Sequence, residues 1–208
     1  MLLSAEHRPD FDIIVGLIPR GSRVLDLGCG SGELLERLVR EKTVTARGVD
    51  LHQPSVSACI SKGLSVFQGD LHEGLADLPD HSFDYVILSR TLQQVKDPDQ
   101  VIRQMLRVGA RAIVSFPNFA YWRIRLHLLF RGTLPISPAL PYAWYNTPNI
   151  RLITIADFED FCRKHGFDIL RRVALRIGNG DDPQLIDRLA GWRGELGMFV
   201  LGNKAKQE

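Results

Sequence analysis

The chain has 208 residues with 45% hydrophobic and 24% charged side chains, which is the composition of an ordinary soluble globular protein. Its net charge of +2 argues neither for nor against an anionic partner. No apolar run approaches the ~20 residues of a membrane span, and the three cysteines are far apart and in no metal-ligand spacing. We therefore expect a cytoplasmic protein without a metal or a membrane segment. A single domain is expected over residues 1–203, before a disordered tail at 204–208.

The first predicted elements lead into a glycine-rich turn. Asp10 can cap a short helix that ends at Pro19, and we expect this helix to pack beside the turn. An apolar strand over residues 23–27 then enters three glycines, and the leucines that follow recur at helical spacing to about Arg40. A strand, a glycine turn and a helix in this order present backbone N–H groups and a helix N-terminus to a ligand.

The spacing of the glycines separates the classes of ligand. The dinucleotide fingerprint G-x-G-x-x-G would need a glycine where the chain has Glu33. The phosphate-binding pattern G-x-x-x-x-G-K-[ST] is absent as well, because Glu33 and Leu34 stand where lysine and serine or threonine would be needed. The chain has D-x-G-x-G-x-G, which resembles motif I of class I S-adenosylmethionine (SAM)-dependent methyltransferases. A tight turn in any α/β protein is the alternative. The motif is formed by Asp26, Gly28, Gly30 and Gly32.

Two further acids stand at the ends of predicted strands. Asp50 lies in the strand at 46–51, and Asp70 follows the strand at 64–67, with a helix between them that ends at Gly63. In open α/β sheets the ligand lies outside the carboxyl ends of the strands. Asp50 comes roughly 20 residues after the glycine turn, where a carboxylate can accept hydrogen bonds from both ribose hydroxyls. An aspartate at a strand end is otherwise a turn residue or a helix cap.

The resemblance to the methyltransferases implies a role for each group. Asp70 would accept from the adenine amino group, the Leu71 N–H would meet the ring, and Asp26 would reach the methionine ammonium. We assign no residue to catalysis and none to a metal. The candidate residues for binding SAM or S-adenosylhomocysteine (SAH) are Asp26, Gly28, Cys29, Gly30, Gly32, Asp50, Leu51, Gly69, Asp70, Leu71 and Ser89.

The rest of the chain completes the fold prediction. A helix begins at Pro98, and Thr154 starts a second helix with a capping-box pattern. Alternating strands and helices predict a parallel sheet covered on both faces. We therefore expect an α/β protein with the three-layer, Rossmann-like class I methyltransferase fold, in which a mostly parallel seven-stranded sheet has an antiparallel last strand. The remaining predicted strands are residues 83–88, 111–116, 167–175 and 197–202.

The segment after the strand at 83–88 bears on catalysis. In many small-molecule methyltransferases of this shape it reads L-x-H-V-x-D-P, and this chain has Gln94 in the place of the histidine. An amide cannot act as a general base near neutral pH, whereas a histidine can. His127 could still supply a base from elsewhere in the chain, and transfer to a nucleophile that needs no deprotonation also stays open.

An insertion at about 119–152 is the distinctive part of the chain. Its predicted helix at 121–131 carries Arg123, His127 and Arg131 four residues apart, in one basic stripe. This pattern is typical of an amphipathic helix docked on the sheet. A membrane-surface helix would have more lysines and greater length, and the nearly neutral chain does not favour nucleic-acid binding.

The second half of the insertion is a proline-stiffened loop with three aromatic residues, Tyr142, Trp144 and Tyr145. Exposing them without a purpose would be costly, so the loop either covers a pocket or contacts another protein. The run L-P-Y-A-W-Y-N-T-P-N-I at residues 140–150, with residues 89–93 and 115–118, closely resembles the methionine biosynthesis protein MetW family.

The resemblance implies a protein of methionine synthesis that works beside a homoserine O-acyltransferase. Asn146 and Arg151 stand where the family pattern has aspartate and histidine. A SAM-binding fold without an evident base could sense the end product of the pathway, because SAM is made from methionine. The alternatives are a genuine small-molecule methyltransferase with its acceptor under the aromatic loop, and an RNA-modifying methyltransferase that uses Arg123 and Arg131.

Overall fold

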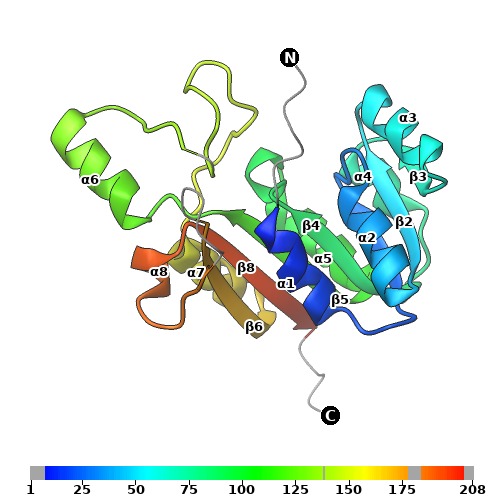
Figure 1. The fold of residues 1–208 in the computed structure, drawn as a ribbon. Coiled ribbons are helices and arrows are strands. Elements are labelled where there is room, and N and C mark those ends of the chain that lie inside the picture. Colours follow the sequence, from blue (N-terminus) through cyan, green and yellow to red (C-terminus); the bar gives the residue numbers. More distant parts are fainter. Residues whose placement is uncertain (1–7, 138, 178–183, 204–208) are drawn as a thin grey trace, which may run out of the picture.

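The computed structural model describes residues 8–137, 139–177 and 184–203 and contains one eight-stranded sheet (Figure 1). The strand order is β3-β2-β1-β4-β5-β8-β6-β7. The first five strands pair in parallel, and β8 runs antiparallel to both of its neighbours, β5 and β6. The strands are β1 (Arg23–Leu27), β2 (Thr45–Asp50), β3 (Ser65–Gln68), β4 (Phe83–Ser89), β5 (Gly109–Pro117), β6 (Phe167–Arg176), β7 (Gln184–Leu185) and β8 (Leu196–Asn203).

This sheet confirms the predicted fold class, with seven main strands of which the last is antiparallel. It adds the short edge strand β7, which pairs antiparallel to β6 through two residue pairs. Two residues are too few to give an alternating pattern in the sequence. The predicted tail at 204–208 lies outside the described residues.

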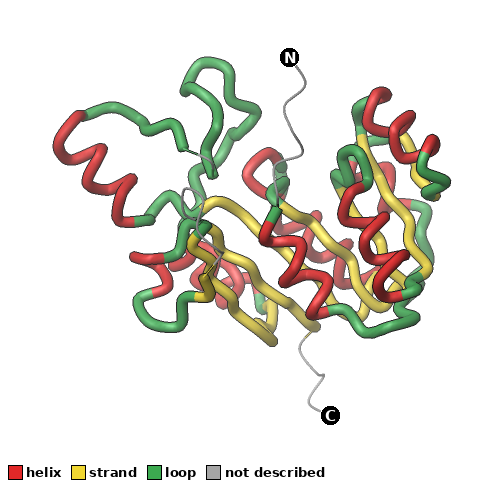
Figure 2. The backbone as a smooth tube through the Cα atoms, viewed as in Figure 1, coloured by secondary structure: helices red, strands yellow, loops and turns green. Residues whose placement is uncertain are grey.

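Helices cover both faces of the sheet, as the alternation predicts (Figures 1 and 2). On one face, α1 and α2 pack on side chains such as Val24 and Ile87. On the other face, α4, α5 and α7 pack on the alternate side chains, such as Leu25 and Val86. The helices are α1 (Pro9–Leu17), α2 (Glu33–Lys42), α3 (Gln53–Ser61), α4 (Leu71–Ala76), α5 (Pro98–Val108), α6 (Trp122–Arg131), α7 (Ile155–His165) and α8 (Ala190–Arg193), with a 3-10 turn η1 (Leu92–Gln94).

The predicted cap of the first helix is wrong. Arg8 occupies the N-cap position of α1, and Asp10 lies in the first turn of the helix. Its carboxylate is fully buried and accepts hydrogen bonds from Arg8, Arg90 and the hydroxyl of Ser89. Burial would raise the pKa of Asp10, but the bonds and charges of the two arginines outweigh burial and hold that pKa below its ordinary value. The residue therefore stays a carboxylate that ties α1 to the end of β4.

The insertion stands away from the sheet, at the upper left of Figure 1. Only Ile124 of α6 is buried, and it packs on Tyr121 and Leu140, which belong to the insertion itself. The expected docking of this helix on the sheet is therefore wrong. The far end of the helix leaves Leu129 and Phe130 exposed, at 73% and 78% of their surface. Figure 2 shows the long loops that return the chain from α6 to α7.

Across the ranges given above, none of the helices combines the length and the apolar character that crossing a membrane requires.

Candidate functional site

The glycine turn joins β1 to α2 at the carboxyl edge of the sheet. Gly28, Gly30 and Gly32 all have positive φ angles, of 71°, 55° and 76°, which glycine adopts far more readily than other residues. Two of them also lack room for a side chain. A Cβ at Gly28 would lie 2.9 Å from the Thr91 hydroxyl, and one at Gly32 would lie 2.6 Å from a methyl of Leu64. The turn thus depends on glycine for its conformation and its packing.

Asp50 holds this turn in place from the end of β2. Its Oδ2 accepts from the N–H of Gly30 at 2.8 Å, and its Oδ1 accepts from the N–H of His52 at 2.9 Å. The side chain is 7% exposed. Each carboxylate oxygen has a second lone pair, so structural support of the turn is compatible with accepting a ribose hydroxyl.

Asp70 begins α4, a short helix that the sequence analysis did not find. Its Oδ1 accepts from the N–H of Glu73 at 2.8 Å, and Oε2 of Glu73 accepts from the N–H of Asp70 at 3.2 Å, which makes a capping box. The cap was the alternative to ligand binding at this position. The cap uses one lone pair of Oδ1, so it is compatible with accepting a hydrogen bond from an adenine amino group.

These residues surround one cleft with a volume of about 450 Å³. Six of the predicted residues line it, and they come from the carboxyl end of β2 and from the chain just after β1, β2 and β3. The opposite wall is formed by residues between β4 and α5, among them Gln94 and Lys96. The sequence analysis did not place His52 here. The predicted lining residues are Gly28, Asp50, Leu51, Gly69, Asp70 and Leu71.

The other predicted residues, Asp26 among them, do not line this cleft. Gly30 and Gly32 complete the turn, and Cys29 points its side chain at Cys59, with 4.0 Å between the sulfur atoms. Burial raises the pKa of the Cys29 thiol, which keeps it protonated. Ser89 hydrogen-bonds Asp10 and Ser115 in the buried cluster that also holds Arg8 and Arg90. The sequence signal for this cluster was weak, because its members are scattered along the chain.

Asp26 is the candidate with the most perturbed ionisation. Its side chain is 3% exposed, and burial raises its pKa to about 7, with the charge of Arg8 opposing the shift and that of Asp50 adding to it. A carboxyl in this state is half ionised near neutral pH. A cationic ligand beside it would favour the ionised form.

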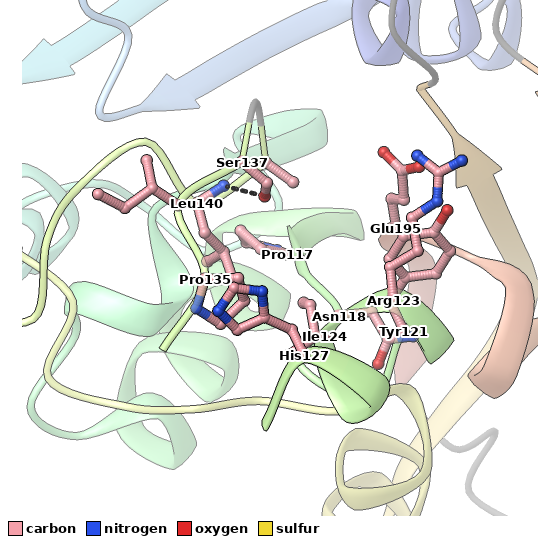
Figure 3. A pocket seen from close by; sticks show the side chains of 12 residues that line it. Pro117, Asn118, Tyr121, Arg123, Ile124, His127, Pro135, Ser137, Leu140 and Glu195 are labelled. Carbon is pink, nitrogen blue, oxygen red and sulfur yellow. Dashed lines mark hydrogen bonds between the residues drawn. The ribbon is translucent and has the colours of Figure 1, made fainter. Parts of the chain in front are cut away.

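No histidine from the insertion reaches this cleft within the described part of the chain. His127 lines a separate cavity of about 250 Å³, between α6 and the ends of β5 and β8 (Figure 3). Its Nε2 lies 3.1 Å from the Thr133 hydroxyl. The histidine beside the cleft is His52, whose backbone N–H is bound to Asp50 at the predicted ribose end. The lining residue Gln94 is exposed on the opposite wall.

The sheet order, the glycine turn and the cleft beside it define a protein of the class I methyltransferase fold, and solved structures bear out this class. A possible histamine N-methyltransferase from Thermotoga maritima superposes with a TM-score of 0.70 at 18% identity, over 95% of this chain and 88% of that one. A SAM-dependent methyltransferase from Archaeoglobus fulgidus gives 0.65 at 15% identity, over 93% and 94%.

Within this fold class, the comparisons identify one family. The family model of the methionine biosynthesis protein MetW matches residues 8–201, and the chain belongs to that family. A bifunctional methionine biosynthesis protein MetXA/MetW from Rhodopirellula baltica is 43% identical over 85% of this chain, and the match spans 31% of that longer protein. A ubiquinone biosynthesis O-methyltransferase from Neisseria meningitidis is 28% identical over 72% of this chain and 65% of its own length.

Proposed function

We propose that this chain is a cytoplasmic, single-domain protein that binds SAM or SAH and acts with a homoserine O-acyltransferase in methionine synthesis. The observation that carries the binding proposal is the convergence of Gly28, Asp50 and Asp70 on one cleft beside a glycine turn. The buried carboxylates of Asp26 and Asp50 suit the ammonium and the ribose hydroxyls, and Asp70, which caps α4, suits the adenine amino group. Family membership supports the pathway.

The partner proposal rests on the bifunctional relative. Its name joins MetXA and MetW functions in one protein, and this chain corresponds to about a third of its length. Fusion holds the two functions together in that relative, and a separate chain can be held beside an acyltransferase by association. We infer that the acyltransferase is the protein that this chain contacts.

The aromatic loop is the surface that best fits this contact. Trp144 and Tyr145 are 75% and 74% exposed, and their rings meet edge to face with centroids 5.7 Å apart. Neither residue is among those that line the cleft beside the glycine turn. This arrangement favours a partner surface over a lid on the adenosyl ligand, because large aromatic side chains dominate the energy of well-packed interfaces.

Replacing Trp144 separates these two roles. We expect Trp144→Ala to abolish copurification with the homoserine O-acyltransferase of the source organism and to leave SAH affinity within about a factor of two. A lid would behave in the opposite way. A tenfold loss of SAH affinity, about 1.4 kcal/mol, with the complex intact would contradict the partner surface. The melting temperature of the variant controls for damage to the fold.

A genuine small-molecule methyltransferase is the second candidate, favoured by the methyltransferases among the relatives. Against it stands Gln94, which cannot take a proton from an acceptor. We expect no transfer of label from methyl-labelled SAM to homoserine or its O-acyl esters. Label in either compound would contradict this expectation, and Gln94→His is the variant in which a base is restored.

A further inference from the structure

One residue of the insertion holds the wall of the cleft. The backbone N–H groups of Ile150 and Arg151 both donate to the carbonyl of Gln93, at 3.0 and 3.1 Å. The guanidinium of Arg151 donates through Nε to the carbonyl of Val95 at 3.0 Å and through Nη2 to the carbonyl of Lys96. Four hydrogen bonds therefore run from residues 150–151 to residues 93–96.

The segment that Arg151 holds is a wall of the candidate SAM site. Gln94, Val95 and Lys96 all line the cleft. Among residues 91–96 themselves, the backbone hydrogen bonds of the described structure form one tight turn, in which the N–H groups of Gln94 and Val95 donate to the carbonyls of Thr91 and Leu92. The buried side chain of Gln93 donates to the carbonyl of Arg90, while its Oε1 has no hydrogen-bond partner among the described residues. The carbonyls beyond the turn thus depend on Arg151.

The same arginine closes the aromatic loop. Trp144 and Tyr145 lie seven and six positions before it along the chain, and the bonds of Ile150 and Arg151 fix the end of the loop to the body of the protein. A guanidinium suits this task, because its planar fork of five donors can serve two carbonyls at once. The cleft wall and the exposed aromatic surface therefore share one anchor.

We propose that Arg151 is a positioning residue that couples the cleft to the aromatic loop. This inference rests on the proposed function. A nucleoside ligand that packs on residues 94–96 fixes the carbonyls of residues 93, 95 and 96. Because these carbonyls accept from residues 150 and 151, the ligand also fixes Arg151 and the loop that presents Trp144. The coupling is reciprocal, so that a partner protein bound to the loop changes the affinity for SAM or SAH by the same factor.

The test measures that coupling directly. The dissociation constant for the homoserine O-acyltransferase is determined with and without saturating SAH, for the natural chain and for Arg151→Met, which keeps the backbone donors and removes the guanidinium. We expect SAH to change the constant at least fivefold in the natural chain and less than twofold in the variant. Arg151→Lys, which keeps the charge but not the fork, covers the case in which the methionine variant fails to fold, and it too should show less than a twofold effect.

Arg125→Met is the matched control. Arg125 is an exposed arginine of the same insertion, whose Nε donates to the carbonyl of Ala120 and whose guanidinium lies over the ring of Trp192. It should keep the SAH effect of the natural chain. A full SAH effect in the folded Arg151 variants would overturn the inference, and so would a natural chain that binds both SAH and the acyltransferase without any effect of one on the other. Failure of the natural chain to bind either of them would instead overturn the proposed function.

Discussion

At the scale of single residues, Asp26 and Asp50 have different roles at the glycine turn. Asp50 is satisfied by two backbone N–H groups and is suited to a fixed set of hydrogen bonds. Asp26 is more deeply buried, and its pKa is raised to about 7 by that burial. One acid therefore shapes the site, while the ionisation of the other can respond to the charge of a ligand.

This difference predicts a dependence of binding on pH. SAH carries an ammonium group, which favours ionised Asp26, so binding should release a proton and affinity should rise from pH 6 to pH 8. Asp26→Asn should bind more weakly at pH 8 and remove most of the slope. Isothermal titration calorimetry in two buffers of different ionisation enthalpy measures the release. Because His52 also lines the cleft, His52→Gln is the control, and a slope that disappears in His52→Gln instead would contradict the assignment to Asp26.

Asp26 should also affect how the stability of the ligand-free protein depends on pH. Its pKa is higher in the folded chain than the ordinary 3.8, so the folded state binds the proton more tightly and the free energy of unfolding falls as pH rises from about 4 to 7. The same Asp26→Asn variant should lack this part of the decline. Urea unfolding of both proteins at pH 5, 6, 7 and 8 gives the free energy of unfolding at each pH. If this free energy falls equally with pH in the natural chain and in the variant, the raised pKa of Asp26 is contradicted.

At the scale of elements, three local signals in the sequence correctly predict where helices begin or end. Pro98 begins α5, Thr154 caps α7 through the N–H of Asp157, and Gly63 follows α3 with a positive φ angle. Each of these depends on neighbours a few positions away. The short helix α4 is not predicted, although Asp70 and Glu73 form its capping box, because its six residues are too few for a helical pattern.

Two other differences from the predictions depend on distant parts of the chain. The buried carboxylate of Asp10 is held by Arg90, 80 positions away, and no local pattern marks such a pair. In the same way, the stripes on α6 indicated an amphipathic helix but not what it packs against. The candidate lining of the cleft was predictable to a larger extent, because parallel strands bring their carboxyl ends to one edge whatever their exact lengths.

The placement of α6 gives a prediction about stability. Phe130 is 78% exposed and Ile124 is 5% exposed. We expect Phe130→Ser to change the free energy of unfolding by no more than about 0.5 kcal/mol, and Ile124→Ala to lower it by about 2 kcal/mol or more. Chemical denaturation measures both. If α6 were docked on the sheet through its apolar end, the Phe130 variant would lose as much stability as the Ile124 variant.

At the scale of the whole molecule, the chain combines a methyltransferase-type sheet with an insertion that stands away from it (Figure 1). The cleft at the edge of the sheet and the exposed aromatic loop are separate surfaces joined through residues 93–96 and Arg151. A protein that reports on SAM to a partner needs both surfaces and a connection between them.

The binding of SAH itself tests the central claim most directly. Calorimetric titration of the purified chain with SAH, with NAD as the comparison ligand, should give a single site for SAH and no binding of NAD. Asp50→Ala should weaken SAH binding by about 1–3 kcal/mol, the loss of a charged hydrogen-bonding group, and its melting temperature shows whether the turn still folds. The absence of SAH binding by the natural chain, or unchanged affinity in a folded Asp50→Ala variant, would contradict the account.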